Sequence, residues 1–368
     1  MSKLLKDEIN EKNIKKLAVL VNRQKASFDV LGFKNAILDS NWPALALKQR
    51  VRKITIQLGT DLDCSYLESI CILKEVSVNF SGLFHFVFAD FVEVFGVEDF
   101  ETSMDALALF TVNSTSEFAI RVFLQKQPEK TKQQILAWSK SDNEHLRRLA
   151  SEGVRPRLPW ATHLPWIAEN PNWVRPILEN LKSDSSRYVQ KSVANLINDL
   201  SKTQVDWVIQ LCQAWQSSQS EQTQWIVKHA LRTLLKQGNP KALALIGYSV
   251  TTHIKVLGWD FDKQVSVGEV WQANFALDSI KDLGLLRLEY ALSFLRKHQS
   301  PYRKVFKIAE ADYKVNHKSF QFKHNFKVIS TRVYVPGKHK IELIMNGQIV
   351  KTAEFELIKH KRAAGLMK

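Results

Sequence analysis

Two different spacings of hydrophobic residues divide the chain near residue 247. In the first part, apolar residues recur every three or four positions, which is the spacing of one buried helical face. One such set is Val189, Val193, Leu196, Ile197 and Leu200. A second set, within Trp225–Leu235, is followed by Gly238 and Pro240, two residue types that typically stop a helix. Residues 1–247 are therefore predicted to form a helical domain.

After residue 247 the spacing of apolar residues becomes two, as in the segments 320–326 and 341–345. Asn346-Gly347 is a strong signal for a two-residue hairpin turn between two strands. About seven short strands in this length predict an immunoglobulin-like β-sandwich over residues 248–368. Residues 287–297 also fit a helix, and the last few residues are expected to be disordered. The sandwich contains no cysteine, which excludes an antibody-type disulfide.

Short sequence matches within the helical part indicate a repeat of about 40 residues. Lys140-Ser-Asp142 recurs as Lys182-Ser-Asp184, and Ala137-Trp138 recurs as Ala214-Trp215 at nearly twice that step. Two helices per unit of this length are typical of HEAT-like repeats, which stack into an α-solenoid. The fold class predicted for the whole chain is a HEAT-like α-solenoid followed by an immunoglobulin-like β-sandwich. An irregular helical domain is the alternative for the first part.

The charge of the chain indicates a polyanionic partner. The formal net charge is +15, from 52 Lys and Arg against 37 Asp and Glu. Residues 248–368 contain 21 Lys and Arg against 11 Asp and Glu, so +10 belongs to the sandwich and +5 to the helical part. Three scattered cysteines, and no apolar stretch long enough to span a membrane, predict a cytoplasmic protein without membrane attachment. No metal or organic cofactor is predicted, and the protein is expected to be a monomer.

Basic residues recur at similar places in the predicted repeat helices. If the repeats stack, these side chains form a track that can hold the phosphates of a nucleic acid. The residues concerned are Arg148, Arg187, Lys191, Lys228 and Arg232. The alternative for each of them is an ordinary solvated helix surface.

The most unusual stretch of the chain, residues 151–176, interrupts the helical pattern. It contains five of the ten prolines and three of the ten tryptophans, so no long helix can run through it. Long ordered loops inside a packed array usually carry a function. This one combines the carboxylate of Glu152 and the guanidinium groups of Arg155 and Arg157 with the indole of Trp160. Such groups suit a cationic base within a polyanionic strand, whereas Trp173 is predicted to anchor the next helix.

The run Leu149-Ala-Ser-Glu-Gly-Val-Arg-Pro-Arg-Leu-Pro-Trp160 resembles the signature of the AlkC branch of bacterial alkylpurine DNA glycosylases, HEAT-like-repeat enzymes related to AlkD. The resemblance covers roughly residues 1–247, with its core at residues 117–238. The predicted sandwich resembles the immunoglobulin-like domain of one AlkC subgroup. This resemblance implies a DNA repair glycosylase that hydrolyses the N-glycosidic bond of cationic N3-alkylated bases, 3-methyladenine and 3-methylcytosine, in double-stranded DNA.

The resemblance also suggests roles for individual residues. Carboxylates near the deoxyribose stabilise the positive charge that develops on the sugar and position the attacking water. The candidates for this role are Glu117, which we expect to start a helix, Glu152, and Asp199 at the end of a repeat helix. Trp160 is the candidate for contact with the damaged base. The candidates for phosphate binding are Arg148, Arg155, Arg157, Arg187, Lys191, Lys228 and Arg232.

A non-catalytic HEAT-like scaffold that binds nucleic acid or protein is the alternative function. Both functions account for the basic charge, but only a glycosylase explains carboxylates embedded in a basic, tryptophan-bearing loop. A DNA repair enzyme of this family is expected in the cytoplasm, associated with the nucleoid.

Overall fold

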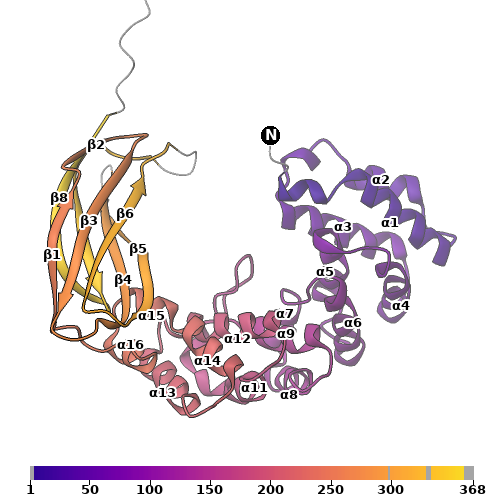
Figure 1. The fold of residues 1–368 in the computed structure, drawn as a ribbon. Coiled ribbons are helices and arrows are strands. Elements are labelled where there is room, and N and C mark those ends of the chain that lie inside the picture. Colours follow the sequence, from indigo (N-terminus) through magenta and orange to yellow (C-terminus); the bar gives the residue numbers. More distant parts are fainter. Residues whose placement is uncertain (1–3, 297–298, 329–332, 360–368) are drawn as a thin grey trace, which may run out of the picture. The chain divides into compact units, whose positions relative to one another are not determined.

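A computed structural model describes residues 4–296, 299–328 and 333–359 (Figure 1). Helices occupy the chain as far as Leu245, and strands begin at Ile254. The predicted fold class, a helical repeat region followed by an immunoglobulin-like β-domain, is confirmed. Residues 360–368, for which we expected disorder, lie outside the described residues.

The helical part consists of short helices joined by tight turns. Its α-helices are α1 (Glu11–Gln24), α2 (Val30–Ile37), α3 (Leu47–Leu62), α4 (Tyr66–Ser77), α5 (Phe86–Phe95), α6 (Phe100–Asn113), α7 (Ile120–Lys126), α8 (Pro128–Trp138), α9 (Glu144–Glu152), α10 (Pro165–Glu169), α11 (Arg175–Leu181), α12 (Arg187–Leu200), α13 (Val205–Trp215), α14 (Glu221–Ala230), α15 (Arg232–Lys236) and α16 (Pro240–Leu245). The structure also describes four short 3₁₀ helices: η1 (Leu5–Glu8) precedes α1, and the α-helices are interrupted by η2 (Trp42–Ala44), η3 (Gly82–His85) and η4 (Pro171–Trp173). Among the described residues, no helix combines the length and the apolar character that crossing a bilayer requires.

The predicted repeats stack through helices α9, α12 and α14. Helix α12 packs against α9 on one side and α14 on the other. Its apolar face is the predicted one, because Val189, Val193, Leu196, Ile197 and Leu200 are all fully buried. Burial of this stripe stabilises α12 within the array, and α12 in turn contacts both neighbouring repeat helices.

The recurring Lys-Ser-Asp segments lie at the contacts between repeats. The guanidinium group of Arg147 binds the backbone carbonyl of Asp142, at 2.8 Å, and the carboxylate of Asp184, at 2.6 Å, in the next such segment. The hydroxyl of Thr223 in α14 donates to the carbonyl of Lys182 at 2.9 Å. The sequence repeat therefore reflects a repeated set of polar contacts between the starts of neighbouring helix pairs.

The apolar set that we placed in one helix over residues 225–235 is divided between two helices. Helix α14 ends at Ala230 and α15 begins at Arg232. Helix α15 ends at Lys236, shortly before Gly238, the residue that we predicted to stop the helix. Gly238 has a φ of 73°, a left-handed conformation that glycine adopts without steric cost.

Within the described residues of the C-terminal part, eight strands form two sheets, one strand more than the number we estimated. The strands are β1 (Ile254–Phe261), β2 (Gln264–Ser266), β3 (Val270–Ser279), β4 (Gly284–Arg296), β5 (Gln299–Tyr313), β6 (His317–Asn325), β7 (Gly337–Met345) and β8 (Gln348–Ile358). One sheet has the order β1-β3-β6 and the other β2-β8-β7-β4-β5. All neighbours are antiparallel except β2 and β8.

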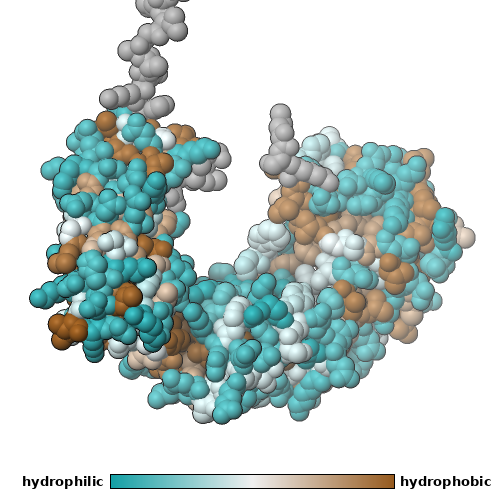
Figure 2. Space-filling model, in the orientation of Figure 1, coloured by the Kyte–Doolittle hydropathy of each residue, from teal (hydrophilic) through white to brown (hydrophobic). Residues whose placement is uncertain are grey.

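Aromatic side chains fill the space between the two sheets. Trp271 of β3 is fully buried and contacts the rings of Phe322 and Phe355, with centroids at 5.8 and 5.2 Å. The outward face that Figure 2 shows is mostly hydrophilic, as the alternating pattern predicts. Residues 284–296 form β4, so the helical alternative for the segment at 287–297 is wrong for its described part.

The predicted hairpin joins β7 and β8. Asn346 and Gly347 have φ values of 46° and 78°, which are the left-handed values that a tight hairpin turn requires. The side chain of Asn346 also accepts a hydrogen bond from the backbone nitrogen of Arg287 at 2.8 Å and donates to the carbonyl of Ser249 at 3.0 Å. The turn therefore ties the segment that precedes β1 to the larger sheet.

The backbone packs into two units whose limits differ from a simple division at residue 247. One unit contains Met1–Val208 with Ser217–Ala230, and the other contains Ile209–Gln216 with Leu231–Lys368. Helices α15 and α16 thus belong with the strands. Within this second unit, Tyr248 donates a hydrogen bond to Glu310 of β5 at 2.8 Å. The domain boundary between residues 247 and 248 stays a prediction.

A buried histidine makes the stability of the helical part depend on pH. His85 is fully buried against Phe88 and Phe110, and neither ring nitrogen has a hydrogen-bond partner among the described residues. Burial lowers its pKa from 6.5 to about 4. As pH falls through this interval, the unfolded chain binds a proton that the folded chain excludes, so the free energy of unfolding decreases.

We expect this decrease to approach roughly 3 kcal/mol between pH 6.5 and 4. Urea unfolding of the protein at a series of pH values measures it. His85→Leu, which keeps an apolar side chain at this position, is expected to flatten the same part of the profile. Identical pH profiles for the two proteins would show that His85 does not cause the dependence.

Candidate active site

Three acidic side chains from separate segments meet in the helical part. Glu117 lies in a turn three residues before α7, Glu152 is the last residue of α9, and Asp199 lies in the last turn of α12. We had expected Glu117 to start a helix, but it lies in the turn that precedes one. The three residues are 8%, 5% and 3% exposed, so all of them have left bulk water. Such burial requires partners, because an unpaired charge in a protein interior is very costly.

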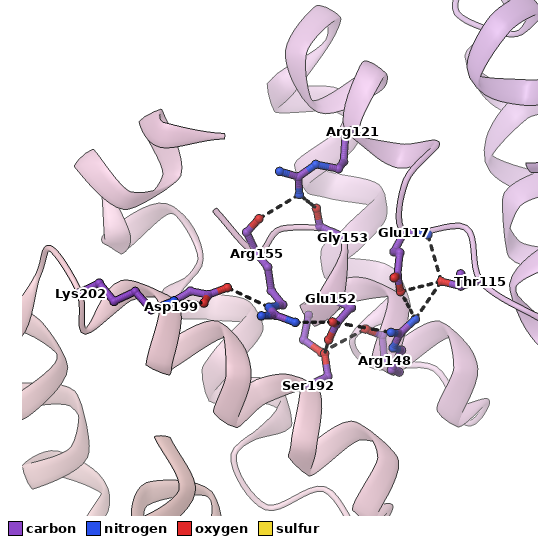
Figure 3. A network of polar contacts seen from close by, with 11 residues as sticks. Thr115, Glu117, Arg121, Arg148, Glu152, Gly153, Arg155, Ser192, Asp199 and Lys202 are labelled. Atoms are coloured by element: carbon purple, nitrogen blue, oxygen red, sulfur yellow. Dashed lines mark hydrogen bonds and ion pairs between the residues drawn. The ribbon is translucent and has the colours of Figure 1, made fainter. Parts of the chain in front are cut away.

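Two arginines join the three carboxylates into one chain of ion pairs (Figure 3). Arg148 forms an ion pair with Glu117 and lies 3.7 Å from Oε1 of Glu152. Arg155 donates from Nη1 to Oε1 of Glu152 at 2.6 Å and from Nε to Oδ2 of Asp199 at 2.9 Å. We call these five residues the carboxylate cluster.

Hydroxyl groups and a lysine complete the contacts of the carboxylate cluster. Ser192 of α12 donates to Oε2 of Glu152 at 2.6 Å. Thr115 donates to Oε2 of Glu117 at 2.7 Å, and the ammonium group of Lys202 binds Oδ1 of Asp199 at 3.1 Å. Each carboxylate is thus held by at least two partners, which fixes the direction of its oxygens before any ligand binds.

The cluster is charged, and its charges depend on one another. Burial raises the pKa of Glu117, and the nearby carboxylate of Glu152 adds to this, while Arg148 opposes it. Burial by itself lowers the pKa of Arg155, but the charges of Glu152 and Asp199 outweigh this effect and raise it. Arg155 therefore stays protonated and keeps two carboxylates together that otherwise repel.

The proline-rich segment begins at the cluster and exposes a tryptophan. Residues 153–164, which we call the motif loop, leave α9 directly after Glu152. Trp160 is 57% exposed and has a φ of 63°, a left-handed conformation that non-glycine residues adopt at a cost. Its carbonyl accepts a hydrogen bond from Lys48 of α3 at 3.2 Å. In contrast, Trp173 is buried against Trp166, with ring centroids at 5.1 Å, which agrees with an anchoring role.

The basic candidates fall into two groups. Arg157, Arg187, Lys191 and Lys228 are exposed, and Arg232 is half-buried. The guanidinium group of Arg187 stacks on the ring of Trp225 at 4.0 Å. Arg148 and Arg155 instead belong to the carboxylate cluster, so the expectation that they hold phosphates does not fit. Their guanidinium groups are largely buried and already bound to carboxylates.

Several residues of this site carry no signal that sequence reasoning could have used. Lys48 lies 112 positions from Trp160, and Ser192 lies 40 positions from Glu152. Arg121 is the exception, because it is a single charged residue in the apolar run Phe118–Leu124. A charge in a buried helical face indicates a specific internal partner. Within the described residues, no group of His, Cys, Asp and Glu is arranged to hold a metal ion.

Comparisons with known proteins match both parts of the chain. The family described as "DNA alkylation repair enzyme" matches residues 108–234, which include the carboxylate cluster and the motif loop. The family described as "Uncharacterised protein YhaZ, C-terminal Ig-like domain" matches residues 257–359, a range that begins within β1 and ends just after β8.

Two relatives are similar over nearly the whole length. The uncharacterized protein YhaZ of Bacillus subtilis is 40% identical over 355 residues, which are 96% of this chain and 99% of YhaZ. Among solved structures, the alkylpurine DNA glycosylase AlkC of Pseudomonas fluorescens, bound to DNA containing an abasic site analog, is 33% identical with a TM-score of 0.91. That match covers 96% of this chain and 99% of AlkC.

Proposed function

This chain belongs to the AlkC-type family of alkylpurine DNA glycosylases with a C-terminal immunoglobulin-like domain, and on that premise we propose its substrate and mechanism. As a DNA repair glycosylase it acts on DNA. The proposed substrates are cationic N3-alkylated bases, 3-methyladenine and 3-methylcytosine, in double-stranded DNA. The proposed mechanism is hydrolysis of the N-glycosidic bond at the carboxylate cluster.

The carboxylate cluster is the observation that carries this proposal. When the bond between C1′ and an alkylated base breaks, the base takes the bonding electrons and becomes neutral. The sugar becomes positively charged and reacts with water, whose proton passes to a carboxylate or to solvent. Fixed negative charges beside the sugar stabilise this state, and they act most strongly where water is excluded. Glu117, Glu152 and Asp199 are buried and held in place, as this role requires.

Trp160 supports a preference for a charged base. Its indole is exposed in the motif loop, which leaves α9 directly after Glu152 of the cluster. The face of an indole attracts cations, so an alkylated base with a positive charge binds there more tightly than a normal base. We propose that the motif loop brings this ring against the damaged nucleotide while the carboxylates face its sugar.

Release of free base from methylated DNA tests the proposed function. We expect the purified protein to release 3-methyladenine from a methylated duplex, measured by chromatography of the free bases, and to leave abasic sites in the DNA. A duplex containing 3-methylcytosine tests the second substrate separately. Tight binding of both duplexes without any base release would contradict the glycosylase and favour the non-catalytic scaffold.

The exposed basic residues of the helical part are proposed to hold phosphates. Lys191→Gln removes one exposed cation from α12 and is expected to weaken binding of damaged and undamaged duplexes equally. The slope of log affinity against log salt should fall by about 1, because one fewer counterion is released. Fluorescence anisotropy over a range of salt concentrations measures both effects.

Lys12→Gln, which removes an exposed lysine of α1, is the matched control. It should leave the salt dependence unchanged. Equal slopes for Lys191→Gln and the wild-type protein would contradict a phosphate contact at Lys191.

The strands are proposed to add contacts with the DNA backbone through their positive charge of +10. This net charge already counts the acids that form ion pairs within the domain. Arg303 and Lys340 both bind Glu342, at 2.7 Å each, and Lys307 binds Glu310 at 2.7 Å. Binding as a monomer stays a prediction.

A further inference from the structure

Arg121 is a buried charge that the ion pairs of the carboxylate cluster do not include. It is the second residue of α7, where its neighbours Ile120, Phe123 and Leu124 are buried apolar residues. Its side chain is 3% exposed, and no carboxylate of the described residues forms a salt bridge with it. Burial lowers its pKa to about 10, so the guanidinium group stays charged at neutral pH. A group this costly to bury must make contacts that a neutral side chain cannot make.

The contacts of Arg121 are backbone carbonyls on both arms of the motif loop. Nη1 donates to the carbonyls of Gly153 and Arg155, at 2.8 and 2.9 Å, on the arm that leaves α9. Nε and Nη2 donate to the carbonyl of Thr162, at 2.8 and 2.5 Å, on the returning arm. The guanidinium group thereby closes the base of the loop, next to the backbone hydrogen bond from Leu164 to Pro156 at 3.1 Å.

One of these contacts connects Arg121 directly to the carboxylate cluster. Arg155 is held at two points: its carbonyl by Arg121, and its guanidinium group by Glu152 and Asp199 (Figure 3). On the other side of the loop, Thr162 is two residues from Trp160, whose left-handed conformation depends on the surrounding structure to hold it. Arg121 therefore lies between the proposed base contact and the proposed catalytic carboxylates, and it binds the backbone next to both.

We propose that Arg121 is a positioning residue for base release, which sets the place of Trp160 relative to Glu152 and Asp199 by clamping the two arms of the motif loop. It touches neither the base nor the sugar. This inference rests on the proposed glycosylase function. As a consequence, Arg121 affects the rate of base release far more than the affinity for DNA. The affinity depends on the exposed lysines and arginines, which lie elsewhere in the protein.

Arg121→Gln and Arg121→Lys test the clamp. Neither glutamine nor lysine can reach three carbonyls on two arms in the planar arrangement of a guanidinium group. We expect both variants to release 3-methyladenine roughly 30-fold more slowly in single-turnover reactions at saturating DNA, which is the effect of losing the contact between the indole and the base altogether. The Kd for an undamaged duplex should stay within about twofold of the wild-type value, since phosphate contacts dominate it.

Arg50→Gln is the matched control, because Arg50 is the same kind of clamp at a different place. It is 6% exposed and donates to the carbonyls of Lys6 and Ile9, at 2.8 and 3.1 Å. Its loss should lower the melting temperature about as much as the loss of Arg121 and leave the rate of base release per folded molecule unchanged. Equal slowing in Arg50→Gln and Arg121→Gln would show general destabilisation and overturn the proposal.

Two further measurements separate positioning from a general structural role. In a Trp160→Ala background, Arg121→Gln should slow base release much less than it does alone, because the ring that it positions is absent. Hydrogen exchange should become faster in residues 153–164 of Arg121→Lys and stay unchanged in α1 to α4. Additive effects with Trp160→Ala, or unchanged exchange in the motif loop, would overturn the inference.

The outcomes also distinguish this inference from the proposed function. A wild-type protein that releases no base overturns the function, whereas an active wild-type protein with equally active Arg121 variants overturns only the clamp. If Arg121→Gln does not fold, Arg121→Lys, which keeps the charge, provides the kinetic comparison.

Discussion

Asp199→Asn is expected to lower the single-turnover rate of base release by at least about 100-fold, the usual cost of removing one fixed charge-stabilising group from an active site. Asparagine keeps the shape of the side chain and removes its negative charge. Asp199 is 3% exposed, so no solvent charge can replace the missing carboxylate beside the sugar. Quantifying 3-methyladenine released from methylated duplex DNA under enzyme excess measures this effect.

Asp184→Asn provides the control for the loss of a buried ion pair. Asp184 lies just before the start of α12, at the end opposite to Asp199. Its side chain is 4% exposed and binds Arg147 at 2.6 Å. Breaking either pair is expected to reduce the free energy of unfolding by about 3–5 kcal/mol. Only Asp199→Asn should affect the rate per folded molecule. Wild-type rates in Asp199→Asn would exclude the assigned role.

Glu152→Gln extends the same prediction within the cluster. Glu152 binds Arg155 and Ser192, at 2.6 Å each, so its loss also loosens the partner of Asp199. We therefore expect a decrease of similar size. The double variant Glu152→Gln, Asp199→Asn should be less impaired than the product of the two single effects, because residues that act as a unit are not additive. A strictly multiplicative result would indicate that the two carboxylates act independently.

Trp160→Ala is expected to slow the release of a cationic base by roughly 30-fold, which corresponds to the loss of a cation–π contact worth about 2 kcal/mol. The indole is 57% exposed, so its removal should change the free energy of unfolding by less than about 0.5 kcal/mol. A large kinetic effect without loss of stability identifies a side chain that acts on the substrate. Single-turnover base release and urea unfolding of the same preparation measure the two quantities.

Trp166→Ala is the control for this experiment, since Trp166 belongs to the same proline-rich segment. Its ring packs against Trp173 at 5.1 Å, so its removal should lower stability and leave the rate of base release unchanged. Trp160→Phe, which keeps a smaller aromatic face, should lie between the wild-type protein and Trp160→Ala. Equal rates for wild type and Trp160→Ala would contradict contact between this indole and the base.

Much of the fold could be predicted from local patterns. The stripe in α12 was recognised because burial of one helical face imposes a period of 3.6, and the β7–β8 hairpin because Asn346-Gly347 suits a turn with two left-handed residues. The break between α14 and α15 was missed. Their apolar residues remain in phase across Leu231, so the pattern contains no signal for it.

The candidate site could be predicted only in part. Glu152 and Trp160 lie in one recognisable run of residues. Asp199 could be predicted because it is an acid at the C-terminal end of a helix, where the helix dipole disfavours a negative charge. The three carboxylates do lie in one network, although their catalytic roles stay a prediction. Arg148 and Arg155 were placed with the phosphate-binding residues, because sequence shows the charge of a side chain and not its partner.

The sequence by itself determined the order of helices and strands, the hairpin, the proline-rich loop and the family, since these depend on residues that are neighbours in the chain. Only the tertiary structure decided which cations face solvent and which are buried with carboxylates. The pairs Arg155–Asp199 and Arg121–Thr162 join residues 44 and 41 positions apart. Such pairs form when stacked helices bring distant segments within hydrogen-bond distance, where exclusion of water makes each charge depend on its partner.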